Sequence, residues 1–187
     1  MSPFFHINNS MSINLSVPSN VNPLSPNGFN FTIGSLPEVE YFCQQVSIPG
    51  ITFGDPILAN PFANMPIPGD HLTYDVLKIR FLVDENMDNY IAIYNWLVGL
   101  GFPQSYQQYI NYVSASQAPV LTQLSTNYST GTMQILNNTN NPVKILTFND
   151  LFPISLETLD FQSTNTDVPY LQGEASFRFS YYTFAAP

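Results

Sequence analysis

Hydrophobic and polar residues alternate with a period of two along several stretches of the chain, which is the pattern of half-buried β-strands. The clearest stretch covers residues 72–83. One of its faces is wholly apolar and is expected to face a core, while the other face is mixed. The apolar face carries Leu77, Ile79, Phe81 and Val83, and the mixed face carries Tyr74, Val76, Lys78, Arg80 and Leu82.

This strand leads through an acidic segment into an amphipathic helix. Asp84 or Asn86 is expected to accept hydrogen bonds from the first free amides, and the acidic residues between 84 and 88 suit the helix dipole. Gly99 and Gly101 are expected to supply left-handed caps, so the helix is predicted to begin near residue 86 and end near residue 98. The expected apolar stripe is Met87, Tyr90, Ile91, Tyr94, Leu97 and Val98.

The period of two recurs on both sides of this strand and helix. Strands are predicted at 29–33, 39–48, 132–136, 143–148, 154–161 and 175–182. Asn137–Pro142 and Thr164–Asp167 are interpreted as polar turns, and Asp150–Pro153 as a break in the chain. Roughly six or seven strands with one helix predict a mainly β (α+β) fold, an antiparallel β-sandwich or small barrel with a flanking α-helix.

The length of 187 residues fits one domain with added segments. Residues 1–28 are rich in Asn, Ser and Pro and are interpreted as an extended N-terminal arm that becomes ordered on a neighbour. The β domain is predicted to cover 29–187, with 103–129 as an insertion. Tyr106, Tyr109 and Tyr112 are spaced by three within it, which predicts a short helical stripe.

Residues 49–70 contain five prolines and three glycines, so we expect a long loop without a continuous ladder of strand pairs. Such a loop either folds over its own core or contacts a partner. If the chain forms oligomers, the loop is expected to supply the subunit interface through its apolar side chains. These are Ile57, Leu58, Phe62, Met65 and Ile67.

Charged residues make up only 9% of the chain, against about a quarter in average soluble proteins. A surface of amides and hydroxyls loses its water at lower cost than a charged surface, which favours self-assembly. The alternative is a secreted or halotolerant β-domain. The net charge of -9, with no cluster of basic residues, argues against a protein that binds nucleic acid through its phosphates.

Candidate chemistry is sparse. Cys43 is the only cysteine and is expected to be a buried small hydrophobe, while His6 and His71 stand far apart in the sequence. The acidic residues near 84–88 are explained by helix capping, and Asp150 and Asp167 by turns. No catalytic, metal-binding or phosphate-binding motif occurs, so neither an enzyme nor a cofactor is expected. No apolar run approaches the ~20 residues of a membrane span, and the first 18 residues do not resemble a signal peptide.

The order of several segments carries a family resemblance that spans roughly 29–102 and 130–184. The segments are 42–51, 68–74, 83–85, the helix with Tyr90, Tyr94, Asn95 and Trp96, the strand entry at Phe152-Pro153, and the closing strand 175–182. With these segments in this order, the chain resembles the tail-tube proteins of contractile-tailed bacteriophages. Tube initiators, baseplate hub proteins and neck-end rings share this likeness and remain alternatives.

The resemblance implies a virion structural protein, made in the host cytoplasm, whose six copies close into a ring. Rings would stack into a tail tube through which DNA passes without specific binding, with sheath or baseplate proteins as further partners and no membrane anchor. Lys78 and Arg80 would then pair with acidic residues of a neighbour. An alternative from another class is a monomeric carbohydrate-binding module, with Tyr74, Tyr181 and Tyr182 as stacking platforms.

Overall fold

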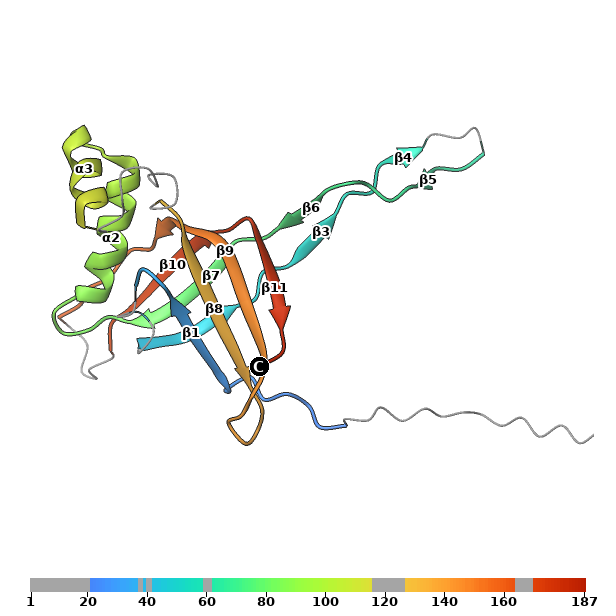
Figure 1. Ribbon diagram of the computed structural model, residues 1–187, viewed down its shortest axis with the longest axis horizontal. Helices are drawn as coiled ribbons and strands as arrows, with labels where there is room; N and C mark the ends of the chain where they lie inside the picture. The colour runs from blue at the N-terminus through green and yellow to red at the C-terminus, as the bar shows by residue number, and fades with distance from the viewer. Residues whose placement is uncertain (1–20, 37–38, 40–41, 59–61, 116–126, 164–169) are drawn as a thin grey trace, which may run out of the picture.

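The computed structural model describes residues 21–36, 39, 42–58, 62–115, 127–163 and 170–187. They form a strongly bent antiparallel β-sheet with two helices at one side and a long hairpin projecting from the opposite side (Figure 1). The predicted mainly β fold with helical flanking is therefore confirmed. The division into a terminal arm and one domain stays a prediction, because residues 1–20 lie outside the described ranges.

The main sheet contains seven strands, and four short strands form two further pairs. The sheet strands are β1 (Phe29–Ile33), β2 (Cys43–Ser47), β7 (Leu77–Leu82), β8 (Ser129–Leu136), β9 (Pro142–Leu156), β10 (Gln172–Arg178) and β11 (Tyr181–Ala185). The paired short strands are β3 (Ile51–Phe53) with β6 (Leu72–Tyr74), and β4 (Ile57–Leu58) with β5 (Met65–Pro66). The helices are α2 (Asp88–Gly101) and α3 (Tyr106–Ala115).

The strand order is β1-β8-β9-β10-β7-β2, with β11 also paired to β9. Strand β9 turns a corner near Asp150, which has a left-handed φ of 56°. Before the corner β9 lies between β8 and β11, and after it β9 pairs with β10. The chain therefore does not break at 150–153 as predicted. The local kink instead divides the sheet into a first half-sheet (β1, β8, early β9, β11) and a second half-sheet (late β9, β10, β7, β2).

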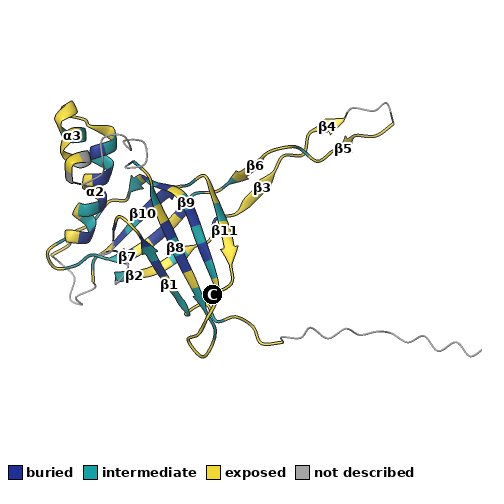
Figure 2. Ribbon diagram, in the orientation of Figure 1, coloured by how far each residue is buried: buried dark blue, intermediate teal, exposed yellow. Residues whose placement is uncertain are grey.

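The core lies between the inner faces of the two half-sheets (Figure 2). Phe31 and Phe148 of the first half-sheet meet edge to face, with ring centroids 6.4 Å apart. Helix α2 contributes Trp96, whose ring lies 6.2 Å from that of Phe177 on β10. Within the described part of the chain β1 and β2 do not pair, so the sheet is an open sandwich and not a closed barrel.

The predicted inner face of β7 is correct, because Leu77, Ile79 and Phe81 are fully buried. The predicted strand at 72–83 is nevertheless two strands, because β6 ends at Tyr74 and β7 begins at Leu77. The closing strand is likewise divided. Between β10 and β11 the Ser180 amide donates a hydrogen bond to the Asn149 carbonyl. After this point the side chains that face the core change from odd-numbered residues, such as Phe177, to even-numbered residues, such as Tyr182.

Helix α2 begins two residues later and ends three residues later than predicted. Its N-cap is Met87 in a left-handed conformation, with φ 61°. The Asp84 carboxylate accepts the Asn89 amide at 3.4 Å, and the Asn89 side chain donates to the Leu82 carbonyl at 2.8 Å. Buried Asn89 thus ties the helix start to the end of β7.

The predicted apolar stripe of α2 is only partly correct, because Tyr90 and Leu97 pack against the core while Ile91 and Tyr94 are exposed. The buried residues are Asn89, Ile93, Trp96 and Gly99. Apolar residues of α2 occur on most sides of the helix, and no charged residue follows Asp88 within it. The periodicity of the sequence therefore does not identify which face of the helix is buried. The predicted glycine caps are wrong, because the left-handed residue after the helix is Phe102, with φ 29°.

Helix α3 confirms the predicted helical segment in the insertion, and it packs against α2. The rings of Phe102, Tyr106 and Tyr109 cluster at the junction of the two helices, with centroids 5.6–6.3 Å apart. Residues 116–126 of the insertion and the predicted turn at 164–167 lie outside the described residues.

Gly173 on β10 allows close packing of Phe81 against the sheet. A Cβ at this position would lie 2.8 Å from the Phe81 ring. Gly173→Ala is therefore expected to lower the free energy of unfolding by about 1–3 kcal/mol through overpacking. Urea unfolding of the purified chain measures this change. Gly101→Ala is the matched control: its Cβ would meet no atom within 4 Å, so an equal loss in both variants would contradict the packing explanation.

Candidate assembly surfaces

Residues 51–58 and 62–74 form a two-stranded projection, here called the hairpin arm (Figure 1). Two hydrogen bonds continue the ladder between its two strand pairs. The Ile67 amide donates to the Pro56 carbonyl at 3.0 Å, and the Gly69 amide donates to the Gly54 carbonyl at 2.7 Å. The expectation that no ladder runs through 49–70 is therefore wrong.

The geometry of a ribbon explains why the prolines are tolerated. Each strand of a two-stranded ribbon has one side without a partner strand, so a proline that lacks an amide proton can lie where no ladder bond is needed. Pro66, for example, lies opposite Ile57 within the β4–β5 pair. The strands also approach closely at Gly69, where a Cβ would lie 2.5 Å from the Gly54 carbonyl oxygen.

The hairpin arm exposes large apolar side chains along its whole described length (Figure 2). The five predicted interface residues of the loop all lie on it and are all exposed, with Phe62 at 96%. The structure adds Ile51, Phe53 and Leu72, which sequence reasoning did not include. Their alternation in short strands was a detectable signal. Exposure of this extent on one thin element is typical of an interaction site.

Lys78 and Arg80 lie away from the hairpin arm, on the outer face of the second half-sheet. Arg80 already has a partner within the chain, because its guanidinium lies 3.2 Å from the carboxylate of Glu174 on β10. Gln45 and Ser47 of β2 lie next to them around a hollow of about 80 Å³. The structure therefore separates the predicted interface residues into an apolar group on the arm and a charged group on the sheet.

The aromatic residues considered for sugar stacking do not form an open platform. Tyr74 and Tyr182 pack against each other with centroids 5.5 Å apart, and each also contacts the Phe179 ring. Only Tyr181 of the three is exposed, at 49%. Two of the three rings are thus occupied by packing within the protein.

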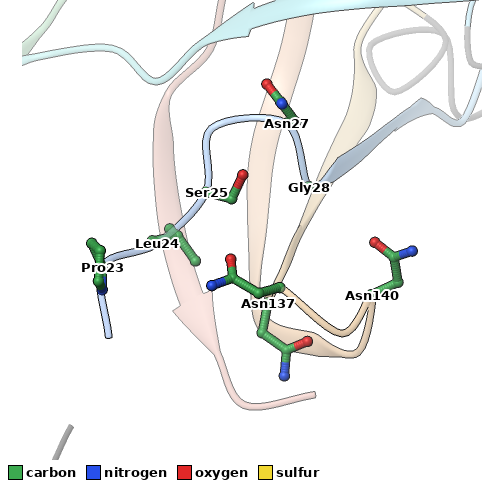
Figure 3. A pocket seen from close by; sticks show the side chains of 8 residues that line it. Pro23, Leu24, Ser25, Asn27, Gly28, Asn137 and Asn140 are labelled. Atoms are coloured by element: carbon green, nitrogen blue, oxygen red, sulfur yellow. The ribbon is translucent and has the colours of Figure 1, made fainter. Parts of the chain in front are cut away.

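A hollow of about 510 Å³ lies between the segment before β1 and the turn that joins β8 to β9 (Figure 3). Its lining is uncharged and contains no aromatic side chain. The lining residues are Pro23, Leu24, Ser25, Asn27, Gly28, Asn137, Asn138 and Asn140. The Asn137 side chain already accepts the Thr139 and Asn141 amides, at 2.9 and 3.0 Å, to hold the turn. Ser25 supplies the only hydroxyl of this lining, and no titratable side chain lines the hollow to activate it, so the groups that acid–base or nucleophilic catalysis requires are not assembled there.

The other candidate chemical groups are explained by structure. Burial, partly offset by a contact with the Gln45 carbonyl, raises the pKa of the Cys43 thiol to about 11, so this thiol is protonated at neutral pH. His71 contacts the Asp70 carboxylate, and both side chains are exposed. Asp84 holds the start of α2 and Asp150 lies at the sheet corner. Asp167 and His6 lie outside the described residues.

The part of the chain that the structure describes holds no group of three or more His, Cys, Asp or Glu side chains placed to bind a metal. Among the same residues, neither helix has the length and apolar character that a membrane span requires.

An open antiparallel sandwich that projects an exposed apolar arm offers a surface suited to contact with other chains. Comparison with known families identifies the class of protein: the sequence model of the phage tail tube protein family matches residues 6–185 of this chain. The chain belongs to this family. Because tail tube proteins are structural, the expectation that the chain is not an enzyme is confirmed. No curated protein sequence matches the chain.

Solved structures of contractile systems share the fold. A chain from the tube-terminating cap of the anti-feeding prophage is similar with a TM-score of 0.58 and 14% identity, over 95% of this chain and 100% of that chain. A chain from the anti-feeding prophage baseplate, six-fold symmetrised, gives 0.56 and 12%, over 88% and 97%. A chain from the sheath–tube complex of an extracellular contractile injection system, PVC, in its extended state gives 0.54 and 12%, over 88% and 93%.

Proposed function

We propose that this protein is the subunit of a hexameric ring, that such rings stack into a phage tail tube, and that the hairpin arm contacts adjacent subunits or rings. One observation carries the proposal: the arm holds eight exposed large apolar side chains on a ribbon too thin to bury them. They are Ile51, Phe53, Ile57, Leu58, Phe62, Met65, Ile67 and Leu72. Contact with another copy would remove this surface from water.

The position of the arm supports a ring. The arm projects from one side of the subunit, and α2 and α3 lie on the opposite side (Figure 1). When an arm contacts a different surface of the next copy, the contact is heterologous, and repeated heterologous contacts close a ring if their rotation allows it. The similar baseplate structure is six-fold symmetrised, which supports six copies in the ring.

Charge supports the passage of DNA through the tube. The net charge of -9 and the scarcity of basic residues give nucleic acid few groups to hold it by its phosphates. Sheath and baseplate proteins are the proposed further partners, and the virion tail is the proposed location. A tube initiator, hub or neck-end ring of the same fold would differ by forming single rings that do not grow.

The test is light scattering of the purified full chain, with negative-stain images of the same fractions. Tubes or stacked rings are the expected result. Single rings that never elongate would support the initiator or neck-end alternative. A monomer of 21.0 kDa that persists at high concentration would overturn self-assembly and favour a monomeric binding module.

The charged group on the second half-sheet provides a separate prediction. Alanine at both Lys78 and Arg80 is expected to weaken ring formation, because it would remove two exposed cations that can meet acidic residues of a neighbour. The effect should be modest, about 2- to 30-fold in the assembly constant, since two exposed ion pairs at ~0.2–1 kcal/mol each amount to about 0.4–2 kcal/mol.

Sedimentation velocity over a concentration series measures this effect. Lys144→Ala is the control, because Lys144 is an exposed cation at the start of β9 and is not part of this group. Unchanged assembly of the double variant would remove these two residues from the proposed interface.

A further inference from the structure

The first half-sheet aligns four threonines in one row across its four strands. Thr32 of β1 lies opposite Thr132 of β8, Thr132 lies opposite Thr147 of β9, and Thr147 lies opposite Thr183 of β11. Their sequence neighbours Phe31, Met133, Phe148 and Tyr182 belong to or pack against the core. Because side chains alternate along a strand, the threonines point away from the core.

The rows on either side of the threonines are also uncharged. One flanking row consists of Asn30, Gln134, Ile145 and Ala185. The other flanking row includes Asn149 and Tyr181, which lie opposite each other. We call these three rows the threonine face. Threonine is β-branched and its χ1 angle is restricted, so the central row presents hydroxyl groups in a regular array, and the flanking rows add amide side chains together with the uncharged Ile145, Ala185 and Tyr181.

The outer face of the second half-sheet has a different chemistry. It carries Lys78 and Arg80 on β7 and Arg178 on β10, which are three of the four Lys and Arg residues of the chain. Among the residues that the structure describes, Glu174 on β10 is the one acidic residue that forms an ion pair on this face, with Arg80. Repeated in every copy of a ring, these side chains would form a belt that attracts phosphate groups.

We infer that the threonine face is the wall of the tube channel and that the material passing it is a polyanion such as DNA. This inference rests on the proposed ring. Lysine or arginine on the wall would bind phosphates through counterion release, and a dense acidic wall would repel the polyanion electrostatically. Hydroxyl and amide groups hold a water layer and do neither.

The edges of the first half-sheet suit this position. Strands β1 and β11 are its two outer strands, so a neighbouring copy can lie beside either edge without disturbing the core. A face of this half-sheet can therefore continue from one copy to the next around a ring.

The inference is tested with single-cysteine variants of the full chain, each in a Cys43→Ser background. Gln134→Cys places a thiol at an exposed position of the threonine face, and Thr147→Cys is a second variant on the neighbouring strand. Asn95→Cys is the matched control on α2, where Asn95 is exposed and belongs to neither proposed interface group. Assembled tubes are treated with a small maleimide, or with a maleimide attached to a globular protein too large to enter the channel.

In tubes, the threonine-face thiols are expected to react with the small reagent and to be protected at least tenfold from the large reagent. The Asn95→Cys control should react with both reagents. Reaction with both reagents would place the face on the outside of the tube, and reaction with neither would place it in a subunit interface. Either result would overturn the inference while leaving the tube proposal intact. If neither the native chain nor any variant assembles, the proposed function fails, and the inference fails with it.

The neutral character of the wall has its own test, using short duplex DNA. Gln134→Lys tubes are expected to sediment with DNA that is protected from nuclease at low salt and released at high salt. Asn95→Lys tubes, which carry the added cation on α2, should hold only DNA that nuclease removes. Native tubes that retain protected DNA at low salt would overturn the inference.

Discussion

Serine at Ile57, Leu58, Met65 and Ile67 together is expected to abolish tube formation while the subunit stays folded. The four side chains are 41–64% exposed on the hairpin arm, so the core does not depend on them. Complete burial of such a side chain is worth about 1.5–3 kcal/mol. Half of that value at four positions amounts to about 3–6 kcal/mol per contact, or roughly 10²- to 10⁴-fold in the association constant.

Sedimentation velocity and negative-stain images of the variant measure this loss, and circular dichroism confirms that the β-sheet remains. The matched control is Ile91→Ser with Tyr94→Ser, which removes exposed apolar side chains from α2, at 44% and 54% exposure, without touching the arm. Tubes that still form from the arm variant would contradict the proposed role of the arm. Equal loss in both variants would show that assembly depends on apolar surface in general.

Phe148→Ala is expected to lower the free energy of unfolding by about 3–5 kcal/mol, enough to unfold a marginally stable domain. Phe148 lies in the middle of β9, is fully buried, and is in ring contact with three other aromatic residues. The centroid distances are 6.4 Å to Phe31, 5.2 Å to Phe179 and 5.7 Å to Tyr182. Removing the ring would leave a cavity at the meeting point of β1, β9 and the β10–β11 segment.

Urea unfolding followed by fluorescence or circular dichroism measures this change. The control is Phe184→Ala on β11, because the Phe184 side chain is 58% exposed and its removal should cost much less. A loss below about 1 kcal/mol for Phe148→Ala would show that the surrounding aromatic rings collapse into the space.

The elements predicted correctly are those whose pattern admits one solution. Strand β1 occupies the predicted residues 29–33, and β7 buries the three predicted residues Leu77, Ile79 and Phe81. In both, strict alternation leaves one face apolar, and burying that face determines the orientation of the strand. The turn between β8 and β9 was likewise predictable, because a polar Asn-rich segment separates two alternating stretches.

Errors occurred where local pattern was ambiguous. Helix α2 is apolar on most sides, so its buried face depends on where β10 and α3 lie and not on its own sequence. The breaks between β6 and β7 and between β10 and β11 depend on partners from distant strands. Ser180, for example, bonds to Asn149, and this contact is not visible in the sequence around Ser180.

The predicted interface residues were partly accessible to sequence reasoning. Apolar side chains between frequent prolines indicated a segment that either folds over its own core or contacts a partner, and the structure exposes all five on the hairpin arm. The prolines also suggested an irregular loop. A ribbon accepts them because each of its strands needs a ladder on one side only. The pairing of Arg80 with Glu174 joins residues far apart in the chain and required the register of β7 with β10.

By itself, the sequence determined the mainly β class, the low charge, the lack of catalytic motifs and the apolar character of the arm segment, because these depend on composition and on periods of two or four residues. Only the tertiary structure decided which strands lie side by side, where β9 bends, and how Thr32, Thr132, Thr147 and Thr183 form one row. Strand register is set by packing between segments that are up to about a hundred residues apart, and no local pattern contains that information.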